Sequence, residues 1–157
     1  MVYISSSSAA TKKLGFDLAR KILRLGPGQR ARVLALTGDL GSGKTTLVQG
    51  FFCGLGVRRQ ATSPTFILMR RAALGRGKFR NVFHLDAYRL HKLSELQALE
   101  LEPVMLNSKN IVLIEWAERI KRALPRLKAS GVLWIRFGHG RQENERKIQM
   151  KNEKIKI

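Results

Sequence analysis

Residues 38–46, GDLGSGKTT, lie between the apolar run VLAL (33–36) and the helix-like stretch LVQGFF (47–52). They match GxxxxGK[ST], the phosphate-binding loop, in the setting that this motif requires, directly after a strand and at the start of a helix. Its three glycines let backbone N–H groups turn inward and form an anion-binding nest at the positive end of that helix. The stretch therefore predicts a nucleotide-binding α/β domain.

Each loop position is a predicted contact for the nucleotide or its metal. Lys44 is expected to bridge β- and γ-phosphate oxygens, and the Thr45 hydroxyl to bind Mg²⁺. Thr46 is either an α-phosphate contact or an ordinary residue of the first helical turn. The predicted nucleotide-binding residues of the loop are Gly38, Asp39, Leu40, Gly41, Ser42, Gly43, Lys44, Thr45 and Thr46.

Two carboxylates stand at the ends of apolar strands. NIVLIE (110–115) ends on Glu115, which has the form of a Walker-B-type acid that holds Mg²⁺ or its water, and NVFHLD (81–86) ends on Asp86. Asp86 could hold a metal-bound water or orient the attacking water. Either acid alone could instead be a turn residue or helix cap, and their joint presence beside a phosphate loop favours the metal and catalytic roles.

The segment SPTF (63–66) is a candidate switch. Pro64 keeps Ser63 extended, and an ordered loop here could bring Thr65 to a γ-phosphate or its Mg²⁺. An ordinary threonine in a strand that begins at Pro64 is an equally open interpretation.

The order of elements predicts one α/β domain over residues 1–150, followed by a charged tail over 151–157. A first helix is expected to begin with Thr11 as its N-cap and to end at Gly26. A helix signalled by Ser94 and Gln97 is expected to break near Pro103. Strands alternate with helices until a C-terminal hairpin, which predicts a three-layer sandwich like that of P-loop NTPases, its sheet mostly parallel with an antiparallel edge hairpin.

The net charge of the chain indicates which partners it could bind more than which fold it adopts. Lys and Arg number 30 against 11 Asp and Glu, which gives a net charge of +19. Such a chain suits a polyanionic partner such as RNA, and a merely solvated basic surface is the alternative. No apolar run approaches the roughly 18 residues that cross a bilayer. The single Cys53 excludes an internal disulfide, as suits a reducing cytoplasm.

Two other functions remain compatible with the motifs. A small-molecule kinase would use the same loop with a second substrate pocket, for which RRAALGRGKFR (70–80) could supply a basic lid. An RNA-binding module with a vestigial nucleotide site would explain the charge, although the intact Lys44 and Thr45 argue against decay of the site.

The ordered set GDLGSGKTT, SPTF, HLDAYRL and LIEWAE resembles the bacterial TsaE family over nearly the whole chain. The resemblance implies a cytoplasmic, magnesium-dependent ATPase of tRNA processing. It would join TsaB-like and TsaD-like partners that place threonylcarbamoyl on the adenosine next to the anticodon, and its ATP hydrolysis would reset that complex. The basic excess is heavier than the resemblance leads us to expect, which raises direct tRNA contact as a hypothesis.

The resemblance also implies roles for single residues. Asp86 would be the acid needed for hydrolysis, Thr65 the switch residue and Lys44 the phosphate contact. Thr45 and Glu115 would hold Mg²⁺. Trp116 would neighbour the nucleotide, and Thr11 would lie near the adenine.

Overall fold

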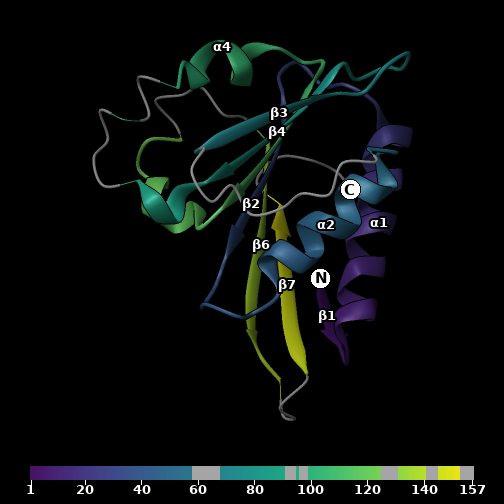
Figure 1. The fold of residues 1–157 in the computed structure, drawn as a ribbon, viewed down its shortest axis with the longest axis vertical. Helices are drawn as coiled ribbons and strands as arrows, with labels where there is room; N and C mark the ends of the chain where they lie inside the picture. Colours follow the sequence, from purple (N-terminus) through teal and green to yellow (C-terminus); the bar gives the residue numbers. More distant parts are fainter. Residues whose placement is uncertain (58–67, 91–94, 96–98, 125–130, 141–144, 153–157) are drawn as a thin grey trace.

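The computed structural model describes residues 1–57, 68–90, 95, 99–124, 131–140 and 145–152. They form a seven-stranded sheet with the order β1-β7-β6-β2-β5-β4-β3 (Figure 1). The strands are β1 (Val2–Ser5), β2 (Arg32–Thr37), β3 (Met69–Ala73), β4 (Asn81–Asp86), β5 (Asn110–Glu115), β6 (Val132–His139) and β7 (Arg146–Asn152). The helical segments are α1 (Ser8–Leu25), α2 (Lys44–Gly54), η1 (Ala87–Arg89), α4 (Leu101–Leu106) and η2 (Ala117–Ile120).

The four central strands, β6, β2, β5 and β4, run parallel to one another. At one edge, β7 and then β1 add antiparallel to β6, and at the other edge β3 adds antiparallel to β4. The predicted mostly parallel α/β sheet with its C-terminal hairpin is therefore confirmed. The second antiparallel edge, formed by β3, is an addition to that prediction.

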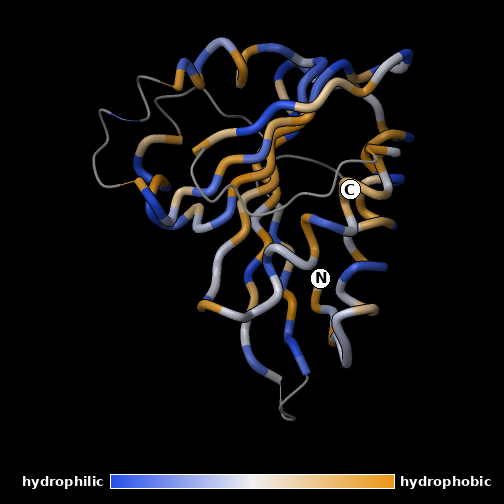
Figure 2. Tube along the Cα trace, viewed as in Figure 1, coloured by the Kyte–Doolittle hydropathy of each residue, from blue (hydrophilic) through white to orange (hydrophobic). Residues whose placement is uncertain are grey.

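Helices cover both faces of the sheet, which explains why its central strands are continuous apolar runs. α1 and α2 pack on one face through a core that includes Leu18, Phe51 and, from β2, Leu36. α4 and the two 3₁₀ segments pack on the other face. The hydropathy colouring in Figure 2 shows the apolar strands enclosed between these layers. The three-layer sandwich follows from strands that must be buried on both sides.

α1 and α2 approach each other backbone to backbone. A Cβ atom added to Gly50 of α2 would lie 2.0 Å from the carbonyl oxygen of Lys12, and one added to Gly15 of α1 would lie 2.2 Å from that of Leu47. Both distances are far below van der Waals contact, so no larger residue fits at either position with the helices in place. The two glycines therefore fix how the helix of the phosphate-binding loop sits against α1.

The prediction that Thr11 is the N-cap of α1 is wrong. The cap is Ser7, whose hydroxyl oxygen accepts a hydrogen bond from the Ala10 N–H at 3.1 Å. The run of serines thus supplies a cap four residues earlier, and Thr11 lies buried inside the helix. The predicted end is confirmed, because Gly26 caps the last turn with φ of 73° and donates its N–H to the Ile22 carbonyl.

Pro103 does not break a helix. It lies in the first turn of α4, where a residue without an N–H loses no intrahelical hydrogen bond. Ser94 and Gln97, which signalled the earlier helix, lie outside the described residues. Within the described part, no helix is long and apolar enough to cross a membrane.

The first and last strands of the described chain pair at one edge of the sheet. β1 was not predicted from the sequence, and it pairs with β7 from Val2↔Gln149 to Ser5↔Arg146. β7 continues to Asn152 and so includes the first two residues of the predicted tail. This pairing brings the serines that follow β1 close to the carboxyl ends of the parallel strands, where the predicted site lies.

Candidate nucleotide-binding site

The phosphate-binding loop leaves the carboxyl end of β2 and enters α2 directly. Gly41 and Gly43 have φ of 73° and 98°, a left-handed conformation that glycine adopts at little cost. Gly43 is the N-cap of α2, and among the described residues no side-chain cap bonds the N–H groups of this helix end. The first turn of α2 therefore presents donors to an anion, as the motif predicts.

Lys44 is buried at the centre of the loop, with only 4% of its surface exposed. Its ammonium group donates to the carbonyl oxygens of Gly38 and Asp39, both at 2.7 Å, and to Ser42 Oγ at 3.4 Å. Burial lowers the pKa of Lys44, and the carboxylate of Glu115 is the strongest of the acids that oppose this shift. A phosphate would supply the anionic partner that this desolvated cation lacks within its own loop.

Glu115 links the loop to two strands. Thr45 Oγ1 donates to Glu115 Oε2 at 2.7 Å, and His84 Nε2 lies 2.9 Å from Glu115 Oε1. The carboxylate is 3% exposed and the histidine 1%. A threonine hydroxyl beside a carboxylate is an all-oxygen pair of the kind that binds Mg²⁺ together with water and phosphate. These two predicted metal ligands therefore lie together and fit the ion.

Asp86 lies beside Glu115, because the two residues are register partners at the ends of the parallel strands β4 and β5. Its Oδ1 accepts a hydrogen bond from the Tyr88 N–H at 3.0 Å and so caps the short segment η1. Asp86 therefore has the helix-capping role that the sequence left open. The cap also orients the carboxylate at the edge of the site, next to the predicted metal ligand.

Trp116 covers the loop lysine. Lys44 Nζ lies 3.9 Å from the centroid of the indole ring, within the range of a cation–π interaction. The tryptophan has φ of 56°, rare for a residue other than glycine, and its ring packs against Tyr88 at 4.8 Å. Arg119 closes this chain of contacts by donating to the Tyr88 carbonyl at 2.6 Å. Trp116 is therefore adjacent to the site, as expected.

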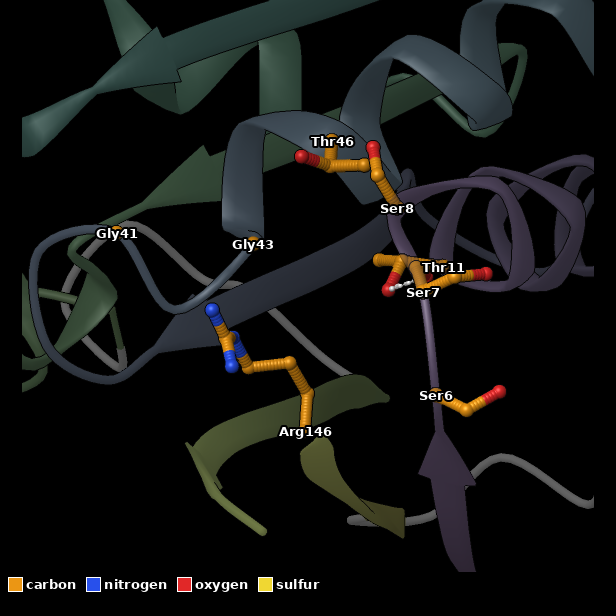
Figure 3. Close-up of a pocket in the computed structure, with 8 residues that line it drawn as sticks. All are labelled: Ser6, Ser7, Ser8, Thr11, Gly41, Gly43, Thr46 and Arg146. Atoms are coloured by element: carbon orange, nitrogen blue, oxygen red, sulfur yellow. Dashed lines mark hydrogen bonds between the residues drawn. The ribbon is translucent and has the colours of Figure 1, made fainter. Parts of the chain in front are cut away.

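A pocket of about 300 Å³ adjoins the loop. Its lining residues come from four elements or their junctions, namely Ser6, Ser7, Ser8, Thr11, Gly41, Gly43, Thr46 and Arg146 (Figure 3). Figure 3 shows the Arg146 side chain directed from β7 toward the loop between Gly41 and Gly43. Thr11 Oγ1 is held by the carbonyl of Ser7 at 3.2 Å and the hydroxyl of Ser5 at 2.7 Å. The pocket is the right kind of space for the nucleoside end of a ligand whose phosphates lie on the loop.

Most of the predicted residues thus converge at the carboxyl ends of β2, β4 and β5. Asp39 and Leu40 are exposed, and Asp39 contributes its backbone carbonyl to Lys44 rather than its carboxylate. Thr65 lies outside the described residues, so its switch role stays a prediction. Within the described part, no group of three His, Cys, Asp or Glu side chains forms a protein-only metal cage.

Sequence reasoning missed the roles of three residues at this site. His84 is buried, and its Nε2 lies within hydrogen-bond distance of Glu115 Oε1, a contact that the sequence did not predict. The i, i+2 spacing of His84 and Asp86 in one strand was the available signal. Ser7 and Arg146 gave no comparable signal, because only the pairing of β1 with β7 brings them to the loop.

Comparison with known proteins shows the family to which the chain belongs. The family model of the threonylcarbamoyl adenosine biosynthesis protein TsaE matches residues 5–148. The chain belongs to the TsaE family. A TsaE protein of Streptomyces coelicolor is 42% identical over 109 residues, which are 68% of this chain and 67% of that protein. A TsaE protein of Treponema pallidum is 31% identical over 122 residues, 78% and 82% of the two chains.

A solved structure supports the family assignment at the level of the fold. The crystal structure of YdiB from Bacillus subtilis superposes with a TM-score of 0.71 at 26% identity, covering 98% of this chain and 85% of that one. The TsaE family match includes the phosphate-binding loop, both strand-end acids and Arg146, since all lie within residues 5–148.

Proposed function

We propose that this TsaE-family chain binds ATP with Mg²⁺, hydrolyses it to ADP and phosphate, and serves tRNA threonylcarbamoyladenosine biosynthesis in the cytoplasm. The observation that carries the proposal is the contact of Thr45 with Glu115 at 2.7 Å, beside the buried Lys44 of an open phosphate-binding loop. The relatives named above are TsaE proteins of tRNA threonylcarbamoyladenosine biosynthesis, which supports the pathway.

Each residue has a distinct task in the proposed reaction. The loop N–H groups and Lys44 hold the β- and γ-phosphates, and the pocket beside Thr11 takes the nucleoside. Thr45 and Glu115 hold Mg²⁺, which neutralises charge on the phosphates when bound. Asp86 orients the water that attacks the γ-phosphate. In the complete reaction that water's oxygen joins phosphorus, the bond to the β-phosphate oxygen breaks, and ADP leaves.

The proposal extends to partners by family membership. TsaB-like and TsaD-like proteins would carry out the transfer to tRNA, and the ATP cycle of this chain would reset their complex between turnovers. We expect slow hydrolysis by the isolated chain and acceleration by such partners. Co-purification with them, in ATP and in ADP, tests this part, and a partner-free chain with fast turnover would contradict it.

Nucleotide binding by matched variants tests the core of the proposal. Lys44→Ala removes the charged contact to phosphate and should weaken binding of a fluorescent ATP analogue by roughly 10- to 100-fold, as loss of a charge-assisted hydrogen bond implies. Lys151→Ala, an exposed lysine on β7, is the control and should bind like wild type. Equal, negligible binding by all three proteins would refute the ATPase.

Hydrolysis is tested separately from binding. Glu115→Gln and Asp86→Asn should retain nucleotide while phosphate release falls on the order of 100-fold or more, since each removes a charge that acts on the transition state. A panel of small-molecule acceptors in the same assay checks the kinase alternative. Transfer of the γ-phosphate to an acceptor, in place of free phosphate, would overturn the hydrolase assignment.

A further inference from the structure

A second charged surface lies at the opposite end of the sheet from the nucleotide site. We call it the basic edge, and it comprises Arg32, Arg71, Arg76, Lys78, Arg80 and Lys109. Except for Arg71, which lies in the middle of β3, these residues flank or begin strands at the end where β2, β4 and β5 start. The phosphate-binding loop, Asp86 and Glu115 lie where those strands finish. Figure 1 shows the β3–β4 turn beside the end of α1, away from the loop that precedes α2.

Contacts between distant segments bring the cations of the basic edge together. The Gly26 carbonyl, at the end of α1, accepts two hydrogen bonds from Arg32 at 3.1 and 2.9 Å. A Cβ atom on Gly26 would lie 3.2 Å from Lys78 Cδ, so that lysine crosses the same point. The Arg80 N–H donates to the Lys109 carbonyl at 2.8 Å, which joins the β3–β4 turn to the start of β5.

Few carboxylates balance this surface. The sequence has no Asp or Glu in residues 18–38, 40–85 or 103–114, which are the segments that build the basic edge. Asp39, Asp86 and Glu115 bound these segments at the far end of the sheet. Even with Glu102 in the first turn of α4 counted in, the edge keeps a large positive excess.

Several of these cations are available to a ligand. Arg76, Lys78, Arg80 and Lys109 are exposed. The side chains of Arg76, Lys78 and Lys109 make no hydrogen bond or ion pair with other described residues. Arg76 and Lys78 lie in the β3–β4 turn, and Lys109 directly precedes β5, so the three cations form a row along the ends of neighbouring strands, whose spacing is about 4.8 Å. Such a row matches successive phosphates of a nucleic acid backbone.

We propose that the basic edge binds the phosphate backbone of tRNA, at a site separate from the nucleotide site. The cations of the basic edge indicate a ligand that carries phosphates. The choice of tRNA among such polyanions rests on the proposed function. Phe79, the aromatic residue of this turn, is 1% exposed and offers no surface on which a base could stack. Recognition is therefore of the backbone, with little dependence on sequence.

The test compares two triple variants that remove the same charge. R76Q/K78Q/K109Q neutralises the basic edge, and R122Q/R136Q/K151Q neutralises three exposed cations elsewhere. Binding of a fluorescently labelled tRNA transcript is titrated across salt concentrations. The edge variant should lose on the order of tenfold in affinity, and the slope of log K against log salt should fall by about two to three, whereas the control variant stays near wild type.

The same samples separate this proposal from the proposed function. Binding of the ATP analogue should be unchanged in both triple variants, and ATP with Mg²⁺ should not displace tRNA. Absence of tRNA binding by wild type, or equal weakening by both variants, would overturn the tRNA site while leaving the ATPase intact. Retained tRNA binding by the edge variant, with loss of association with TsaB-like and TsaD-like proteins, would overturn it in favour of a protein contact.

Discussion

At the scale of single residues, the site depends on how the Glu115 carboxylate is held. One oxygen accepts from Thr45 and the other meets His84, so both are fixed before a metal arrives. Groups that orient a metal ligand commonly change metal affinity or activity by 10- to 100-fold when they are removed. His84 is thus a positioning residue that acts through Glu115.

Replacement of His84 tests this role. His84→Leu leaves a buried carboxylate oxygen without its partner, so we expect hydrolysis to fall by about 10- to 100-fold and the Mg²⁺ requirement to rise. The KM for ATP should change little, because the phosphate contacts remain. His84→Gln, which keeps an N–H donor, should recover most of the activity. Equal loss in both variants, at equal melting temperatures, would refute positioning.

Residue identities at the site were largely predictable, and their partners were not. The motif fixes Lys44 and Thr45, and strand-end positions favour Asp86 and Glu115, since parallel strands finish at one edge. The contact of His84 with Glu115 joins residues 31 apart in the sequence. The i, i+2 spacing of His84 and Asp86 could suggest that both face the site, but it could not identify Glu115 as the partner. For Thr11 the local pattern was misleading. It suggested an N-cap at a position that lies inside α1, whose cap is Ser7.

At the scale of elements, the close contact of α1 with α2 leaves no room for a side chain at Gly15 or Gly50. Gly50→Ala would place a Cβ atom 2.0 Å from a backbone carbonyl, and the helices would have to separate. We expect a loss of about 1–3 kcal/mol or more in the free energy of unfolding, as overpacking typically gives. Chemical denaturation measures it.

Gly77→Ala serves as the matched control for that measurement. A Cβ atom there would lie 3.7 Å from the nearest atom, the Phe79 carbonyl oxygen, which is ordinary contact. Its unfolding free energy should stay within about 0.5 kcal/mol of wild type, as is usual for surface positions. Equal effects of the two substitutions would show that the helices tolerate separation and that the contact is not tight.

The parallel strands and main helices could be predicted because their patterns are local and strong. β2, β4 and β5 are apolar runs bounded by polar residues, and α1 has a regular apolar face with a glycine stop. β1 could not be predicted, because four residues at a chain end form a strand only when β7 offers a partner edge. Its pairing with β7 brings Ser6, Ser7 and Arg146 together at the pocket beside the loop.

At the scale of the whole molecule, ligand binding and folding are coupled. Because the loop, both strand-end acids and the β1–β7 edge meet at one site, a nucleotide that binds there stabilises the folded chain. At a nucleotide concentration 100 times its Kd, this contributes about 2.7 kcal/mol. For a chain of 157 residues we expect a rise in Tm of about 5–10 °C.

Differential scanning fluorimetry with ATP and Mg²⁺ measures this shift. With EDTA in place of Mg²⁺ the rise should shrink, because no cation would then offset the negative charges of Glu115 and the phosphates. Lys44→Ala should show a small shift under either condition. A full shift in EDTA would contradict the assignment of Thr45 and Glu115 as metal ligands.

The backbone contact between α1 and α2 also bears on motion. It ties the start of α1, which lines the pocket beside the loop, to α2, which follows the phosphate-binding loop. These two parts therefore cannot easily slide past each other. For the proposed ATP cycle, we expect opening and closing to arise on the opposite side, where Trp116 packs against Tyr88 beside Asp86. We therefore expect the mechanical signal of hydrolysis to leave the molecule through the ends of β4 and β5.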